Sequence, residues 1–207
     1  MRKLSLSVLL LFCISLGSFA QEERKTFKLT EEERKAFEVQ CQERIDAFQM
    51  GLEIIADKQQ SGELKNHYIT TILDMFMGKG EPWKDVNGGQ HRAVKMQVSS
   101  VNNGTTNDVL LKNYLPALRD LKQYTYVEIK KAKTCVLSNF HPISDNMYMA
   151  TCAFFQYFTG KKGEVLVYKD YTQKDVDVYI QRIEDGSLGA YWDMKFGDIN
   201  VTETRKQ

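Results

Sequence analysis

The sequence predicts an α+β fold, in which two or three N-terminal helices pack on a strongly bent antiparallel sheet. Two observations lead to this prediction. In residues 30–76, apolar side chains recur every three or four positions, which is the spacing of amphipathic helices. From residue 124 onward, β-branched and aromatic runs alternate with polar residues and are separated by turn-forming residues. Helices followed by a series of strands favour an α+β arrangement over alternating βαβ units.

The first 20 residues have the pattern of a cleavable signal peptide. Arg2 and Lys3 precede an apolar stretch that is short for a bilayer span, and Ala20 is a small residue of the kind found at cleavage sites. A membrane anchor is the weaker alternative, because charged sequence follows at once and no second apolar run appears. We therefore expect an exported protein, periplasmic or secreted, with residues 21–207 forming one domain that has no stable membrane insertion.

The net charge and the cysteine spacing bear on whether the protein binds nucleic acid or a metal ion and on whether it forms a disulfide. Loss of residues 1–20 would lower the formal net charge from +1 to −1, so no global field would attract nucleic acid. Three cysteines would remain, Cys41, Cys135 and Cys152, without the spacing of metal ligands. If the segments on either side of residues 143–144 form a hairpin, Cys135 and Cys152 face each other and a disulfide is geometrically conceivable. Two buried free thiols are the alternative that we favour.

Two long helices are expected at the start of the domain. Thr30 and Glu33 form a capping box, and an apolar stripe follows on one face, opposite a solvated charged face. Ser61 is expected to cap a second helix, which Gly78 and Gly80 end. The stripe of the first helix consists of Phe37, Cys41, Ile45, Phe48, Leu52 and Ile55.

The remaining elements follow from changes in periodicity. Residues 93–101 predict a strand, after which Asp108 is expected to cap a third helix that Pro116 bends or shifts. Four further β segments are predicted, and one of them contains an internal turn around residues 169–173. These segments are residues 124–137, 147–158, 164–183 and 190–202.

The order of these elements, together with local phrases, resembles the nuclear transport factor 2-like superfamily, whose fold is also called cystatin-like. The phrases are residues 94–100, 113–118, 168–174 and 191–204, and the last two are similar to exported, uncharacterised bacterial members. The resemblance covers about residues 61–204 and implies a bent sheet that forms a cone covered by helices. It implies no particular reaction, because the superfamily includes isomerases, dehydratases, hydrolases and non-enzymatic binding or dimerisation modules.

An aromatic set is the feature most compatible with a ligand pocket in a curved sheet. It consists of Tyr148, Phe154, Phe158, Tyr168 and Trp192. The alternative is a plain hydrophobic core. The partner that such a pocket would hold, whether a small molecule, a glycan or a protein, is left open.

Candidates for acid–base chemistry are few. The three histidines lack metal-ligand spacing, so neither a metal nor a cofactor is expected. His141 precedes Asp145 by four residues in a presumed hairpin loop, and the carboxylate could orient the ring. Glu128, between Tyr126 and Lys130, is the other candidate.

Two charged clusters have simpler interpretations. Asp170, Asp175 and Asp177 form an acidic cluster that could serve acid–base chemistry or bind a cation if the carboxylates converge. Asp175 and Asp177 alternate with aliphatic residues, however, which favours the solvated face of a half-buried strand, and residues 170–172 are expected to form a turn. The lysines of residues 130–133 lie near aromatic residues, as in single-strand nucleic-acid sites. The balanced charge counts against nucleic acid, and lysines on an edge strand also prevent edge pairing.

From the sequence, the leading functional hypothesis is an exported, non-catalytic binding or interaction module. The first alternative is a small-molecule isomerase, dehydratase or hydrolase with an acid or a histidine in the sheet cavity. The second alternative is a homodimer whose interface is the sheet face that carries Phe155 and Tyr157.

Overall fold

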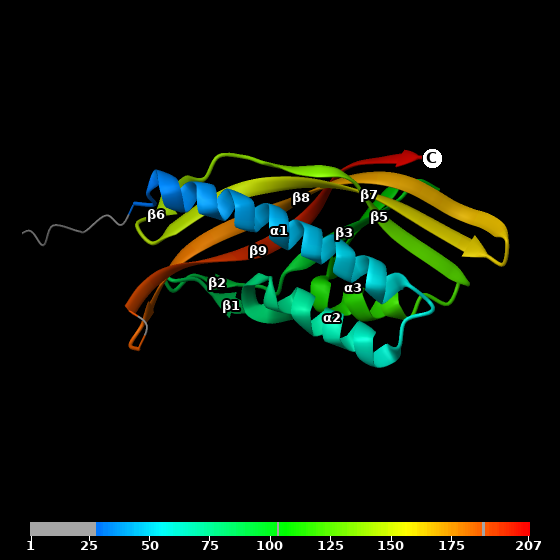
Figure 1. The fold of residues 1–207 in the computed structure, drawn as a ribbon, viewed down its shortest axis with the longest axis horizontal. Coiled ribbons are helices and arrows are strands. Elements are labelled where there is room, and N and C mark those ends of the chain that lie inside the picture. The colour runs from blue at the N-terminus through cyan, green and yellow to red at the C-terminus, as the bar shows by residue number, and fades with distance from the viewer. Residues whose placement is uncertain (1–27, 103, 188) are drawn as a thin grey trace, which may run out of the picture.

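The computed structural model describes residues 28–102, 104–187 and 189–207, so the predicted signal peptide lies outside the described residues. In this part of the chain, helices pack against a strongly curved sheet (Figure 1). This confirms the predicted α+β fold. The helices are α1 (Glu31–Ala56), α2 (Gly62–Asp74) and α3 (Leu111–Arg119), with a 3₁₀ turn η1 (Met77–Gly80) after α2. None of the described helices is long and apolar enough to cross a membrane.

Seven strands form the main sheet, in the order β4-β3-β9-β8-β7-β5, and β6 pairs with β7 beside this path. The strands are β3 (Lys95–Ser100), β4 (Thr105–Leu110), β5 (Tyr126–Leu137), β6 (His141–Ser144), β7 (Met147–Lys162), β8 (Val165–Asp185) and β9 (Gly189–Lys206). A separate hairpin pairs β1 (Trp83–Lys84) with β2 (Gln90–His91). The lysine-rich strand β5 lies at one edge of the sheet path, which agrees with the edge interpretation of residues 130–133.

The sheet is mixed and not wholly antiparallel as predicted. Strand β9 pairs in parallel with β3 through Met96 and Ile199, while the other pairings in the sheet are antiparallel. Ladder irregularities interrupt the pairing of β8 with β9 between Gln173 and Lys174 and between Val176 and Val178. At both places the extra residue lies on β9, so the bulges bend β9 and increase the local twist of the sheet.

Helix α1 forms as its sequence predicts. Thr30 and Glu33 make the reciprocal hydrogen bonds of a capping box, and the apolar stripe lies against the sheet. Phe48 is fully buried, and its ring meets those of Phe76 and Phe154 edge to face at 5.5 and 5.7 Å. This aromatic contact is the centre of the hydrophobic core.

The third helix starts later than predicted. Residues 105–110 form β4, which pairs with β3, and Asp108 lies on this strand, where it accepts a hydrogen bond from Lys95 Nζ at 2.7 Å. The expectation that Asp108 caps the helix was therefore wrong. Helix α3 begins at Leu111 without a side-chain cap and keeps Pro116 inside it. Burial of its leucines, and not a cap, holds this helix in place.

Strand β8 is continuous from Val165 to Asp185, so the predicted turn around residues 169–173 does not exist. Asp170 pairs with Phe158 on β7 and with Lys206 on β9, and Lys174 pairs with Phe154 on β7. Side chains alternate between the two faces of this long strand. Residues 170, 172 and 174 face inward, and residues 171 and 173 face outward.

Candidate functional site

A pocket of about 440 Å³ lies between α3 and the inner face of the sheet. Its volume falls within the range of small-molecule binding sites. Strands β3 and β4 supply one wall, α3 covers it, and β7 with β8 form its floor. Its polar lining includes Tyr114, Gln156, Tyr168, Asp170, Thr172 and Lys174.

The inner face of β8 changes character along its length. Positions 170, 172 and 174 are polar and buried, whereas Val176, Val178 and Ile180 continue the same face into the hydrophobic core. Alternation along a strand places all six side chains on one side of the sheet. The pocket therefore lies at the polar end of a surface whose other end is solid core.

Asp170 is a buried carboxyl group, with 4% of its surface exposed. Its Oδ2 accepts a hydrogen bond of 2.7 Å from the hydroxyl of Tyr168, which itself accepts a 3.2 Å bond from the Val101 N–H. Its buried Oδ1 has no hydrogen-bond partner among the described residues. Burial raises the pKa of Asp170, although Tyr168, the charge of Lys174, the Thr172 side chain and the Phe158 N–H favour its charged form.

Tyr168 is affected in turn by this arrangement. Burial and the hydrogen bond to Asp170 raise the pKa of Tyr168 to about 12. The phenol therefore stays protonated near neutral pH and donates to the carboxylate. It thus fixes the orientation of Asp170 within the pocket.

Lys174 is as buried as Asp170, with 4% of its surface exposed. Within the described part of the chain it makes no hydrogen bond or ion pair, although the charge of Asp170 is near enough to act on it. Burial lowers the pKa of Lys174 to about 8. An amine without a partner in a pocket is available to a ligand.

Two more polar side chains face the same space. Tyr114, on α3, makes no hydrogen bond in the described structure, and burial raises the pKa of its phenol, with the charge of Asp170 as a second cause. Gln156 lies opposite Thr172, and its buried Oε1 has no partner among the described residues. Unpaired buried polar groups cost free energy, so several of them in one pocket indicate a polar ligand.

Apolar and aromatic side chains complete the walls. Phe158 contacts the rings of Tyr124 and Tyr168 at 5.9 and 5.7 Å. A Cβ on Gly160 would lie 2.6 Å from the Tyr124 ring, so glycine is needed for the ring to lie over this strand. Leu118 and other aliphatic residues cover the opposite side. The pocket thus combines an apolar enclosure with a few polar groups, as small-molecule sites do.

The aromatic set suggested by the sequence divides between three places. Phe158 and Tyr168 line the pocket. Phe154 is fully buried in the core against Phe48, so it cannot meet a ligand. Tyr148 and Trp192 contact each other at 5.6 Å near the start of α1, far along the sheet from the pocket.

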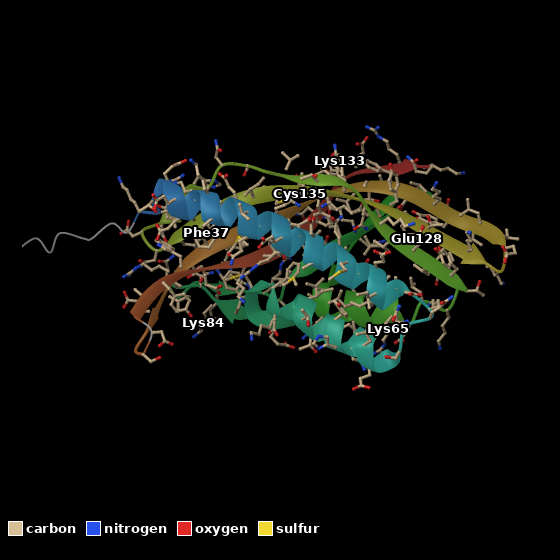
Figure 2. The ribbon with its side chains drawn as sticks, in the orientation of Figure 1. Phe37, Lys65, Lys84, Glu128, Lys133 and Cys135 are labelled. Atoms are coloured by element: carbon tan, nitrogen blue, oxygen red, sulfur yellow. The ribbon has the colours of Figure 1, made fainter. Side chains whose placement is uncertain are left out.

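The other acid–base candidates lie outside the pocket. His141 and Asp145 are both exposed, and no hydrogen bond or ion pair joins them in the described structure. Glu128 lies on the outer side of the edge strand (Figure 2), where Tyr126 donates to it at 3.0 Å and Lys130 is 2.6 Å away. These contacts with solvent-exposed partners lower the pKa of Glu128 and leave it no role in an enclosed site.

The outer face of the sheet is partly covered by its own side chains. Lys133 lies 3.7 Å from the centre of the Phe155 ring, and Tyr171 stacks on that ring at 6.4 Å. Phe155 is 3% exposed and Tyr157 is 36% exposed. Asp175 lies on this face as expected but is not fully solvated: it is half-buried, its Oδ1 has no hydrogen-bond partner among the described residues, and burial raises its pKa. A homodimer through this face stays a prediction.

The cysteine pairing differs in register from the expected one. Cys152 lies opposite Leu137 and not opposite Cys135, because the β5–β7 ladder is irregular between Lys133 and Val136. Cys135, Cys152 and Cys41 are free thiols, and Cys135 donates to Gln42 Oε1 at 3.1 Å beside α1. The neighbouring thiol of Cys152 and burial raise the pKa of Cys135. A disulfide between Cys135 and Cys152 stays a prediction.

The residues that carry the pocket chemistry were missed at the sequence level. Asp170 was assigned to a turn, and Lys174, Tyr114 and Gln156 were not singled out. One signal was available: residues 168, 170, 172 and 174 share the parity of Val176, so one long strand places all of them on the core side. A polar run with the parity of a core face is a pattern typical of a cavity.

No group of three or more His, Cys, Asp or Glu side chains gathers in metal-binding geometry among the described residues. No protein-family model matches the sequence, and no curated protein sequence matches it.

Two solved structures are similar in fold. A provisionally named scytalone dehydratase from Novosphingobium aromaticivorans has a TM-score of 0.44 at 7% identity, covering 85% of this chain and 91% of that chain. A protein from Kribbella flavida has a TM-score of 0.40 at 11% identity, covering 82% and 95%. At these scores the similarity carries no argument about function.

Proposed function

We propose that the domain binds a small organic molecule in the pocket beneath α3 and acts on it by acid–base chemistry, as an isomerase or a dehydratase does. Asp170 is the proposed proton-transfer group. The observation that carries the proposal is its buried carboxyl, oriented by Tyr168 and left with one oxygen unpaired. This function differs from the non-catalytic module that the sequence favoured, because the sequence did not reveal a buried acid.

The electrostatics of Asp170 suit proton transfer near neutral pH. A general base works best when its pKa is close to the operating pH, and burial raises the pKa of Asp170 in that direction. The Tyr168 hydroxyl holds one carboxyl oxygen in place. The other oxygen is then the one that accepts a proton from the ligand.

Hydrogen-bond donors are available for the negative charge that forms on a substrate. Removal of a proton next to a carbonyl group places charge on the carbonyl oxygen. Tyr114 and Lys174 both line the pocket and have no protein partner in the described structure. They are the proposed donors to that oxygen, with Asp170 as the base.

A test uses 2-tetralone, a bicyclic ketone with acidic hydrogens beside its carbonyl group. Residues 21–207, the chain without its predicted signal peptide, are incubated with the ketone in D₂O, and hydrogen–deuterium exchange is followed by proton NMR. We expect exchange faster than in buffer and a loss of on the order of 100-fold in Asp170→Asn, the size typical of removing a general base. Asp175→Asn changes a carboxyl group on the opposite face of the same strand and should keep the full rate.

Two results would count against the proposal. Equal exchange in the wild type and in buffer, with 2-tetralone bound, would favour the non-catalytic binding module. That second candidate is supported by the pocket and its unpaired polar groups alone. Equal loss in Asp170→Asn and Asp175→Asn would indicate a general effect on the fold.

A further inference from the structure

Two lysines of the described structure are buried, Lys65 at 6% and Lys174 at 4% exposure. Lys65 lies on α2 (Figure 2), whereas Lys174 projects from β8 into the lining of the pocket. The pair shows that burial alone is not what distinguishes Lys174. Its position in a cavity of small-molecule size does.

The surroundings of Lys174 provide no structural reason for a lysine. A lysine that stabilises a fold from the interior is normally paired with a carboxylate, because an isolated buried charge is costly. Lys174 makes no ion pair in the described residues, and the nearest carboxylate, Asp170, is hydrogen-bonded to Tyr168 instead. A methionine would fill the same position between Phe154 and the pocket without that cost.

A ladder irregularity lies at this position. The pairing of β8 with β9 shifts between Gln173 and Lys174. Bulges redirect side chains and are common beside active sites. The extra residue, Thr202, lies on β9, so the strand that pairs with β8 is distorted beside the residue whose amine reaches the cavity.

We propose that Lys174 is a nucleophile that forms an imine with the carbonyl group of an aldehyde or ketone held in the pocket. The inference rests on the proposed function and names its substrate class. Lysines that are desolvated in apolar pockets serve as Schiff-base nucleophiles because a neutral fraction of the amine exists near neutral pH. Burial lowers the pKa of Lys174 to about 8, so such a fraction is present.

The step balances without any other reagent. Asp170 accepts a proton from the Lys174 ammonium group, and the free amine adds to the carbonyl carbon, forming a C–N bond. The electron pair of the C=O double bond moves to oxygen, which takes a proton from the nitrogen. Asp170 then returns its proton to the hydroxyl group, water leaves, and the nitrogen lone pair forms the protonated imine. The products are the iminium ion, the Asp170 carboxylate and one molecule of water.

Borohydride trapping tests this step with 2-naphthaldehyde as the probe. The folded mature protein is incubated with the aldehyde, reduced with sodium borohydride, digested and mapped by mass spectrometry. We expect the reduced adduct on Lys174 to form at least 10-fold faster than on any other lysine. The matched control is Lys65→Arg, which should leave the labelling unchanged, whereas Lys174→Arg should abolish it.

The pH dependence adds a second readout. Titratable groups that line the pocket with Lys174 are Asp170 and Tyr168 on β8, Tyr114 on α3 and Tyr124 between α3 and β5, and the lining residues of β3, β4 and β7 do not titrate. Among these, Lys174 is the group with a pKa of about 8. Labelling of Lys174 should therefore be half-maximal near pH 8, whereas surface lysines should label about 100-fold less at that pH.

Labelling spread evenly over the surface lysines, or unaffected by Lys174→Arg, would overturn the inference. The first of these results does not depend on the stability of the variant, because the adduct is mapped in the wild-type protein. Absence of a Lys174 adduct, with Asp170-dependent exchange of 2-tetralone intact, would reject the nucleophile and leave the proposed function standing. An adduct on Lys174 without Asp170-dependent exchange would reject the acid–base function and support the nucleophile.

Discussion

The two ends of the inner face of β8 differ although they belong to one strand. At one end, Val176, Val178 and Ile180 are fully buried beneath α1, where the Phe48, Phe76 and Phe154 rings fill the space. At the other end, Asp170, Thr172 and Lys174 are equally buried but line an open pocket beneath the short helix α3.

The comparison shows that side chains in this fold are excluded from solvent in two ways, by close packing or by the walls of a pocket. At the aliphatic end, side chains are buried because other side chains touch them, and this contact stabilises the protein. At the polar end, side chains line an open space, and two of their buried oxygen atoms, Gln156 Oε1 and Asp170 Oδ1, have no hydrogen-bond partner among the described residues. Enclosure of that kind costs stability and is a property of functional sites.

The largest effect is expected at the aliphatic end. Phe48→Ala would remove a fully buried ring that contacts Phe76 and Phe154. We expect the free energy of unfolding to fall by about 3–5 kcal/mol because a cavity replaces the ring. Urea denaturation followed by circular dichroism measures this. A loss below about 1 kcal/mol would show that the aliphatic end is not close-packed.

The next largest effect is expected at the polar end, where replacing Lys174 should stabilise the protein. Burial lowers the pKa of Lys174 to about 8 in the folded protein, from its ordinary value of 10.5, so the folded state binds fewer protons than the unfolded state between these pH values. Wild-type stability should therefore rise as pH increases from 8 to 10.5. Below pH 8 the full cost, up to about 3 kcal/mol, is present.

Lys174→Met removes that cost. The variant should be more stable than the wild type at pH 7, and the advantage should shrink when urea denaturation is repeated at pH 10. Lys65→Met, at the other buried lysine, provides the comparison and should show no such pH-dependent gain. A less stable Lys174→Met variant at pH 7 would mean that the amine has a structural partner.

A smaller effect concerns the Tyr168 phenol. Asp170→Asn removes the charge that favours the protonated phenol, while burial, the larger cause, remains. The pKa of Tyr168 should fall from about 12 but stay above its usual value of 10.0. A pH titration of ¹³C-tyrosine NMR shifts measures it, with Tyr168→Phe used to assign the signal. An unchanged pKa would show that Asp170 does not influence the protonation of Tyr168.

The smallest effect is expected on the outer face. Asp175→Asn changes a half-buried carboxyl group next in sequence to Lys174 but on the opposite side of the sheet. Unfolding free energy should change by less than about 1 kcal/mol. The labelling rate of Lys174 by 2-naphthaldehyde should be the same as in the wild type. A large change in that rate would mean that the two faces are coupled.

Much of the fold follows from local patterns. The capping box at Thr30, the stripe of α1 and the start of α2 after Ser61 were predicted from the sequence and are found in the structure. Strand β4 was missed because Asp108 resembles a helix cap, and pairing with β3, a contact between chain segments, determines its conformation. Local patterns cannot report such pairing.

The candidate site was less predictable. Aromatic residues suggested a pocket, but Phe154, Tyr148 and Trp192 lie elsewhere, because an aromatic side chain fills a core as readily as it lines a cavity. Polar residues 170–174 suggested a turn, because polar side chains are common in turns and in functional pockets alike. The pairing of residues 170–174 with both β7 and β9 shows that they belong to a strand and not to a turn.

The sequence alone therefore determined the two N-terminal helices, most of the later strands and the apolar face of each, since periodicity and capping act over a few residues. The tertiary structure alone decided that the polar part of β8 is enclosed. It brought Tyr114 of α3 to the same space as Asp170 and Lys174, which are more than 50 residues away along the chain. Enclosure depends on where α3 lies over a curved sheet, and that position results from packing between elements distant in sequence.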